Sequence, residues 1–503
     1  MSHRNYLLGG VALCGVLALA VPANAQSASA LNNQVQELQD QVRRLNQQLQ
    51  NLQGQVQQTQ QNQAQTQKTV TEMKSSPGGG VGGAVVKMLN GRPVFESADG
   101  QTTLGITGRL HFDMGAYNWK PDSKGTTPQS LNSGVNARRA RLGVTGKFMG
   151  DWDYNLIFDF GGSTDSGANV VLENAYITYN GLNPFHFDLG YQDVPYTLDE
   201  ATSSNNIMFI ERSSAQVIAA NLAAGDNRSA IGARWNNDRA WVGIYGTGPT
   251  AGGTHNQPRN FGAFGRATYQ VLQAPDYSLH IGADVEGVIH TEGGTSVSLA
   301  DRPELRVDPT TILGVQTLGN TTSSSIGSAA NPVSGASVYG AELAGGFGSF
   351  FAQAEYFHYN IARRGLADLN FNGGYVEASY TVTGESRKYS PGCGCYGGIS
   401  PAHPFSLKAG GWGAFELAAR YSVVDLNDNF TAGSLVGSGF AGGKQTIYAF
   451  GLNWYPNNNL RFMLDYLHGV IDRTEAGNGG PVPIGTSTGG TMDAVALRTQ
   501  FAF

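Results

Sequence analysis

The stretch Thr491-Met-Asp-Ala-Val-Ala-Leu-Arg-Thr-Gln-Phe-Ala-Phe503 ends the chain and alternates between its two sides. One side carries Val495, Leu497, Phe501 and Phe503, and the other carries Ala494, Ala496, Arg498 and Gln500. This period of two predicts a β-strand with one apolar face. An alternating strand that runs to a terminal phenylalanine is typical of bacterial outer-membrane barrels, in which lipid covers the apolar face and closure satisfies the backbone.

The N-terminus predicts export. His3 and Arg4 give a weakly basic start, residues 7–21 are apolar, and Ala23-Asn24-Ala25 is a small-x-small cleavage site. We therefore expect residues 1–25 to be a secretory signal peptide, because the apolar run is too short and wrongly flanked for a spanning helix.

The composition favours a membrane barrel. The chain has 503 residues, of which 69 are glycine and only 14% are charged, and its net charge of −6 gives no sign of nucleic-acid binding. Beyond the signal peptide no run reaches the roughly 18 apolar residues of a transmembrane helix. A secreted multi-domain β protein is the alternative. Cys393 and Cys395 would form a strained disulfide and are too few for structural zinc, so we expect an incidental pair in a loop.

Residues 31–74 carry a heptad pattern of about six repeats. The a positions are Val35, Val42, Leu49, Val56, Gln63 and Val70, and the d positions are Leu31, Leu38, Leu45, Leu52, Thr59, Thr66 and Met73. The pattern predicts a periplasmic coiled coil, with peptidoglycan as a candidate partner; a glutamine-rich disordered spacer is the alternative. A Gly-rich linker follows at 75–84 and leads into a barrel domain at 85–503.

The rest of the chain predicts about 16 alternating strands, an even number as in bacterial single-chain barrels. The clearer ones span 103–116, 137–148, 152–160, 185–192, 261–272, 277–289, 351–360, 374–383, 414–424, 446–454, 460–470 and 491–503, and the weaker ones lie near 170–180, 229–236, 239–246 and 337–346. Short and long connections alternate between them, which predicts periplasmic turns and outer loops. The segment 385–410 is the exception, because it is long where a periplasmic turn is expected.

An ordered series of segments resembles the phosphate-selective porin O/P family. The segments are 99–113, 138–146, 190–204, 209–213, 374–389, 413–422, 453–457, 461–466 and Arg498-x-Gln500. The resemblance covers essentially all of 99–503 and implies an all-β, 16-stranded outer-membrane barrel, usually a homotrimer, that passes small anions such as phosphate or polyphosphate. It also implies inward-folded loops and a folded-in periplasmic turn, which would explain 385–410. The coiled coil is not general to the family.

Alternation predicts which side chains face the lumen, because the apolar side of each strand must face lipid. The expected substrate-binding, pore-lining residues are Arg109, Arg139, Arg141, Arg234, Arg266, Arg420, Arg461 and Arg498. The expected inward acids are Asp153, Asp159, Asp188, Asp284, Glu286, Glu342, Glu355, Glu377, Glu416 and Asp465. Closure joins the first and last strands, so arginines there should form a basic wall that faces an acidic wall. Guanidinium groups suit phosphate because their planar fork binds oxyanions bidentately. The alternative for each arginine is a pair with a neighbouring carboxylate.

Two connections supply candidate constriction residues, namely Arg212 and Arg228 near 194–228 and Arg387, Lys388 and Lys408 in 385–410. The first segment is net acidic, whereas the second is net basic. Neither the carboxylates nor the nine histidines show catalytic or metal-ligand spacing, so we expect no enzyme activity, metal or cofactor. The sequence therefore predicts a passive channel for small anions, and the alternatives are a general, weakly selective porin and a structural protein that tethers the outer membrane to the cell wall.

Overall fold

The structure is a computed structural model that divides into two compact units, Met1–Gly79 and Gly80–Phe503. In the second unit it describes residues 84–89, 91–122, 130–162, 170–222, 227–251, 260–274, 276–291, 297–318, 333–431, 434–474 and 486–503. In the first unit only scattered positions between 36 and 54 are described, and these are helical and exposed. The signal peptide, most of the coiled coil and nearly all of the linker lie outside the described residues, so these three segments stay predictions.

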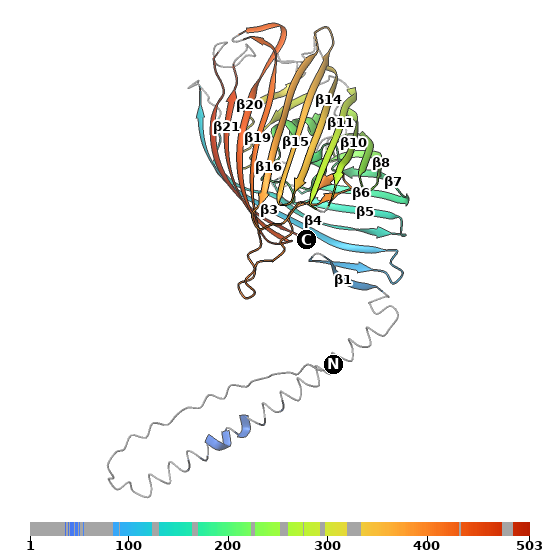
Figure 1. The fold of residues 1–503 in the computed structure, drawn as a ribbon, viewed down its shortest axis with the longest axis vertical. Helices are drawn as coiled ribbons and strands as arrows, with labels where there is room; N and C mark the ends of the chain where they lie inside the picture. The colour runs from blue at the N-terminus through green and yellow to red at the C-terminus, as the bar shows by residue number, and fades with distance from the viewer. Residues whose placement is uncertain are drawn as a thin grey trace, which may run out of the picture. The chain divides into compact units, whose positions relative to one another are not determined.

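Sixteen strands of the described chain close into an antiparallel barrel (Figure 1). They are β3 (Thr103–Pro121), β4 (Gly134–Phe148), β5 (Trp152–Asp159), β6 (Val171–Leu182), β7 (Phe185–Gln192), β8 (Arg228–Asn236), β9 (Ala240–Thr247), β10 (Asn260–Gln273), β11 (Tyr277–Thr291), β14 (Val333–Phe347), β15 (Phe350–Arg363), β16 (Leu369–Thr381), β19 (Ala414–Thr431), β20 (Ser434–Asn457), β21 (Leu460–Asp472) and β22 (Gly490–Ala502). Neighbours in the chain pair with each other, and β22 pairs with β3. Closure leaves the sheet without the exposed edge that lipid would not tolerate.

All sixteen predicted strands are confirmed, and Phe185–Gln192 has the expected bounds. The largest differences between predicted and observed strand bounds are at the long loops. There β19 extends to Thr431 and β20 begins at Ser434. Beyond the lipid band a strand has no apolar face to maintain, so its alternation no longer marks where it ends.

Burial alternates along the strands as the pattern predicts. On β3, Leu110 is 42% exposed on the outside, whereas the neighbouring His111 and Asp113 are fully buried inside. Aromatic side chains gather at the short-turn end, where the Trp454 ring stacks on Phe415 and Phe462. Aromatic girdles of this kind mark the interface between lipid and water.

An additional hairpin of β1 (Val85–Leu89) and β2 (Arg92–Glu96) joins the sheet through β2 and β3. The hairpin pairs with the start of β3, which the last strand does not reach. The last strand ends at Gly108 of β3, where the backbones of Gly108 and Phe503 exchange hydrogen bonds of 3.1 and 3.0 Å. This hairpin was not predicted from the sequence.

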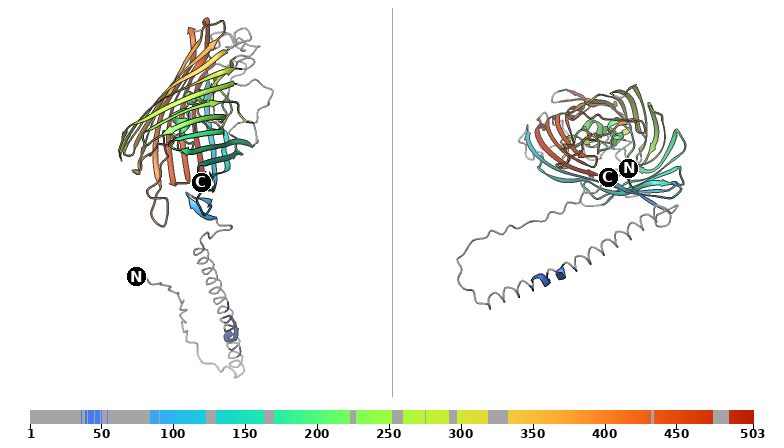
Figure 2. Two further views of the ribbon diagram at one scale, coloured as in Figure 1. Left: turned by 90° about the vertical axis from the view of Figure 1, so that its right-hand side faces the viewer. Right: turned by 60° about the horizontal axis from the view of Figure 1, so that its bottom comes forward.

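Connecting segments fill the interior of the barrel (Figure 2). They contain α2 (Leu198–Ala201), α3 (Ser214–Leu222), the β12–β13 hairpin (Val297–Asp301 and Leu313–Leu318) and the β17–β18 hairpin (Tyr389–Ser390 and Cys395–Tyr396). Apolar side chains of these segments pack on the inner wall, so the core lies between the wall and the inserted chain. None of the helices in the described part of the chain has the length and apolarity needed to cross a membrane.

Candidate functional site

The segment 193–222, here called the inserted loop, is held against the last strands by arginines of the wall. Arg498 donates to the carbonyl of Ile210 (2.6 Å) and to the Glu211 carboxylate (2.9 Å). Arg420 donates to the carbonyl of Glu211 at 2.9 Å, and Arg461 donates to the carbonyl of Asn205 at 3.2 Å. These three predicted pore-lining residues therefore anchor a loop.

Electrostatics hold the inserted loop at Glu211. Burial raises the pKa of its carboxyl, but the guanidinium groups of Arg138, Arg498 and Arg139 outweigh burial and hold that pKa well below the usual range. The carboxylate is therefore ionised at neutral pH, as an anchor for several arginines must be.

Arg138 is a contact that the sequence analysis missed. Its Nε donates to Glu211 at 2.8 Å, although alternation places it on the lipid side. The register shifts by one residue where His111 and Asp113 pair with Arg139 and Asn136, which is a β-bulge. A bulge lets two successive side chains point the same way, so Arg138 and Arg139 are both buried inside. No signal in this single sequence marks the bulge.

The hairpin β12–β13 supplies a second acid that the sequence analysis did not predict. Glu304 accepts from Arg420 at 2.6 Å and from the backbone N–H of Ser214 at 3.0 Å. It thereby joins the wall, the inserted loop and the hairpin, and it gives Arg420 a carboxylate partner.

The segment 385–410 enters the barrel through its first part. Arg387 donates from Nε and Nη2 to Glu416 (3.0 and 2.8 Å), and its Nη1 donates to the carbonyl of Asn206 in the inserted loop. Lys388 and Lys408, the other predicted constriction residues of this segment, are exposed.

Arg266 is fully buried and fastens the same segment. It forms a bidentate pair with Glu342 at 2.6 and 3.0 Å and donates to the carbonyls of Cys393 and Gly394, both at 2.8 Å. The two cysteines, which the sequence analysis read as an incidental pair, form a disulfide between Cys393 and Cys395. The turn between them bends enough for two residues this close in sequence to meet.

Other predicted residues are also paired. Arg141 contacts Asp159 at 2.9 Å and Glu173 at 2.5 Å, and Arg234 contacts Asp188 at 3.0 Å. In the inserted loop, Arg212 lies 3.4 Å from Glu200, and it also donates to backbone carbonyls. Arg228, at the start of β8, donates to the carbonyl of Asn221 at 3.2 Å.

A cavity of about 530 Å³ opens where β3 and β4 face the inserted loop. Its charged lining consists of Arg92, Arg109, Arg139, Arg141, Arg212, Glu173, Asp193 and Glu200. Five guanidinium groups against three carboxylates leave two positive charges. Arg109 and Arg141 lie directly opposite each other across the two strands, an arrangement of like charges that destabilises a sheet unless something compensates it.

Arg109 and Arg139 differ from the other predicted arginines. Among the described residues, neither forms an ion pair with a carboxylate. Arg109 donates to the hydroxyls of Ser204 at 2.7 Å and Ser203 at 3.1 Å. Arg139 is 3% exposed, and its Nε and Nη1 have no hydrogen-bond partner in the part of the chain that the structure describes. Both arginines line the cavity.

Known proteins resemble this chain over most of its length. Porin O of Pseudomonas aeruginosa is 26% identical over 412 residues, which cover 78% of this chain and 89% of that protein. An uncharacterized protein of Caulobacter vibrioides is 28% identical over 398 residues, which cover 76% of this chain and 71% of that protein. Among solved structures, in-vitro folded OmpT of Vibrio cholerae is similar with a TM-score of 0.47 and 11% identity, over 80% of this chain and 98% of that one.

The family model of the phosphate-selective porins O and P matches residues 104–503. This match begins one residue after the start of β3 and runs to the end of the chain, so it includes the whole barrel and its inserted segments. The chain belongs to the family of phosphate-selective porins O and P, and it is an outer-membrane β-barrel and a channel protein rather than an enzyme.

Proposed function

We propose that the protein is a passive channel for small oxyanions of the phosphate and polyphosphate type, and that the cavity beside β3 and β4 attracts them. The observation that carries this proposal is Arg139, which is buried yet has guanidinium donors without protein partners among the described residues. A buried donor without a partner costs about 1–3 kcal/mol. An oxyanion in the cavity would offset that cost.

The composition of the cavity supports an oxyanion rather than an arbitrary anion. Arginine presents planar pairs of N–H donors that fit two oxygens of a phosphate group, whereas a chloride ion gains little from that geometry. The hydroxyls of Ser203 and Ser204, which accept from Arg109, add polar groups that can rotate toward a ligand.

The same cavity contains groups that limit affinity. Glu173, Asp193 and Glu200 line it beside the arginines. Carboxylates repel an oxyanion and so shorten its residence. A channel needs this balance, because binding must be strong enough for entry and weak enough for release.

A planar bilayer experiment tests the proposal. The protein is inserted into a bilayer under a chloride gradient, the reversal potential is measured, and phosphate is added. We expect anion selectivity and a chloride current that phosphate blocks. In the variant Arg139→Gln the block should weaken roughly tenfold or more, because one charge-assisted hydrogen bond contributes about 1.5–3 kcal/mol.

Arg234→Gln is the matched control, since Arg234 faces the interior, pairs with Asp188 and does not line the cavity. It should retain the phosphate block. Equal loss in both variants would indicate a diffuse positive field. Weak selectivity without any block would favour the alternative, a general porin in this scaffold.

We further propose that the barrel assembles as a homotrimer through the short-strand face, defined as the adjacent strands β7, β8 and β9. These strands have 8, 9 and 8 residues, at or below the roughly 9–11 that a strand needs to cross a bilayer. The face is nevertheless apolar, since Ile231 and Ile244 are 66% and 68% exposed. A neighbouring copy would cover an apolar face that is too short to meet lipid along its whole height.

The variant Ile244→Lys tests this assembly, with Ile244→Val as the conservative control. On an unheated gel, the lysine variant should migrate as a folded monomer while the valine variant stays oligomeric. If the lysine variant also migrates as a folded oligomer, the contact between copies lies elsewhere on the barrel.

A further inference from the structure

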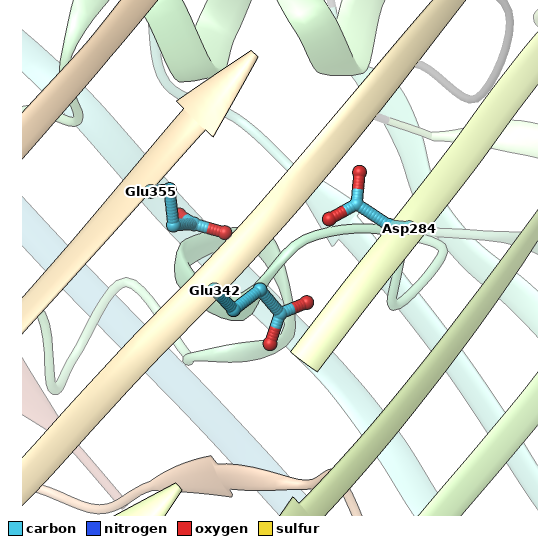
Figure 3. A group of neighbouring side chains, drawn as sticks. All are labelled: Asp284, Glu342 and Glu355. Atoms are coloured by element: carbon cyan, nitrogen blue, oxygen red, sulfur yellow. The ribbon is translucent and has the colours of Figure 1, made fainter. Parts of the chain in front are cut away.

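Three carboxylates from neighbouring strands meet inside the barrel, on the wall formed by its middle strands (Figure 3). They belong to Asp284 on β11, Glu342 on β14 and Glu355 on β15, and each contributes an oxygen within 4.8 Å of the other two. Glu342 and Glu355 are direct cross-strand partners. Like charges in that position destabilise a sheet. Positively charged groups or hydrogen-bond donors must therefore offset the repulsion between these carboxylates.

Protein groups compensate two of the three carboxylates. Glu342 accepts from Arg266 at 2.6 and 3.0 Å and contacts His280 Nε2 at 3.0 Å. Glu355 accepts from the backbone N–H groups of Leu198 at 2.7 Å and Asp199 at 3.2 Å. Both side chains are therefore fixed in place by their partners.

The third carboxylate has neither an ion-pair partner nor a backbone N–H donor among the described residues. Asp284 is 6% exposed, and neither of its oxygens makes a hydrogen bond within that part of the chain. The hydroxyl of Tyr196 lies beside Asp284 and interacts with its carboxylate. A buried carboxylate without a compensating group is costly, and this one is directed into a space that two other carboxylates share.

Two glycines make room for this arrangement. Asp284 pairs across the strands with Gly340, and Glu342 pairs with Gly282. A methyl group at Gly340 would fall on the Asp284 carboxylate, and one at Gly282 would lie 2.6 Å from Glu342 Oε2. The missing side chains allow the carboxylates to lie flat along the wall and to approach each other.

We propose that Asp284, Glu342 and Glu355 form a binding site for one divalent cation of the calcium or magnesium type. Oxygen ligands are those that such hard cations prefer. Ligands on opposite sides of one Ca²⁺ are about 4.6–5.2 Å apart, since each lies about 2.3–2.6 Å from the ion. The separations of up to 4.8 Å fit that geometry. Three carboxylates and the guanidinium of Arg266 sum to a charge of −2, which a divalent ion cancels.

The site would connect selectivity to the inserted loop. Glu355 holds the start of α2, so a cation at its carboxylate stiffens the base of that loop. It also cancels negative charge on the wall opposite the arginines. This consequence rests on the proposed anion channel, whereas cation binding itself does not.

The sequence predicted no metal site, because no cluster of acids is close in sequence. The three residues become neighbours only through strand register, which places positions 284, 342 and 355 side by side. Pairing of the two glutamates, and the pairing of Asp284 and Glu342 with glycines, is visible only once that register is known.

The test uses the full chain refolded in detergent from inclusion bodies, so that no lipopolysaccharide contributes cation sites. After treatment with a chelator, Ca²⁺ and Mg²⁺ are titrated by calorimetry. We expect one site per chain. The variant Asp284→Asn should bind at least tenfold more weakly, and Glu286→Gln, a buried acid on the same strand, should bind like the unmodified protein.

A second pair of variants keeps every charge. Gly340→Ala displaces the Asp284 carboxylate and should also weaken binding, whereas Gly287→Ala on β11 makes only ordinary contacts and should not. This pair of variants tests the site even if Asp284→Asn fails to fold.

Absence of binding in the unmodified protein overturns the site. Equal loss in Asp284→Asn and Glu286→Gln also overturns it, because binding would then follow the general field. In bilayers, Ca²⁺ should increase anion selectivity of the unmodified channel and not that of Asp284→Asn. If calorimetry shows binding but Ca²⁺ does not increase anion selectivity, the cation site stands. That result would contradict only the proposed link between the site and the anion channel.

Discussion

Arg498 on the last strand and Asp113 on the first form a bidentate ion pair, with distances of 2.6 and 2.7 Å, across the seam that closes the barrel. The two residues are register partners in the β22–β3 pairing and are fully buried. Arg498 also reaches the carbonyl of Ile210 and the carboxylate of Glu211. One guanidinium group therefore joins the two ends of the sheet to the inserted loop.

Removing one member of this pair should weaken the seam. In Asp113→Asn, Arg498 keeps its charge but loses its bidentate partner inside the barrel, and we expect a loss of about 3–5 kcal/mol in the free energy of unfolding. Urea unfolding in detergent, followed by the change in gel mobility, measures it. The double variant with Arg498→Gln should lose less, since the guanidinium that has lost its bidentate partner is removed as well. A loss below about 1 kcal/mol in Asp113→Asn would mean that this buried ion pair contributes no more to stability than a surface ion pair does.

Docking of the inserted loop should resist acid. The pKa of Glu211 is lowered in the folded protein, so its contribution is complete above the ordinary glutamate pKa of about 4.3 and is lost as the pH falls through the lower, folded value. We expect single-channel conductance to stay constant from pH 7 to below about pH 4. Glu211→Gln should give noisy, altered conductance at every pH. A wild-type transition near about pH 5–6 would contradict the assignment.

The turn inside the barrel should open when its anchor is removed. Arg387→Met abolishes the contacts with Glu416 and the carbonyl of Asn206, and leaves a buried carboxylate short of a partner, at a cost of about 3 kcal/mol. We expect higher and noisier conductance in bilayers. Lys388→Met is the control, because the neighbouring lysine is exposed and should carry no docking energy. Identical traces for both variants would exclude the turn as part of the constriction.

Deletion of residues 31–84 should distinguish the role of the predicted coiled coil from the function of the channel. Because the heptad pattern lies outside the barrel domain, we expect unchanged conductance and selectivity. If the coil tethers the outer membrane, the deletion should also increase vesicle release from cells, which nanoparticle counting measures. A change in conductance would show that the N-terminal segment contributes to the pore.

The sequence predicted the barrel well because lipid imposes one rule on every strand. A residue that faces lipid must be apolar, so alternation revealed all sixteen strands, including the weak one near 170–180 that became β6. The hairpins β12–β13 and β17–β18 escaped prediction, because they lie inside the barrel and follow no such rule. Arg138 was missed for a related reason, since a single inserted residue reverses the alternation locally.

The order of charges along the chain, which predicts an arginine-rich first-and-last wall facing an acidic middle, is a property of the sequence alone. What each charge does is a property of the tertiary structure. Inserted segments arrive from distant positions and pair with Arg420, Arg461 and Arg498, whereas Arg109 and Arg139 face a cavity instead. Covalent order and lipid exposure act strand by strand, but an ion pair needs two side chains within about 4 Å, and only the folded chain decides that distance.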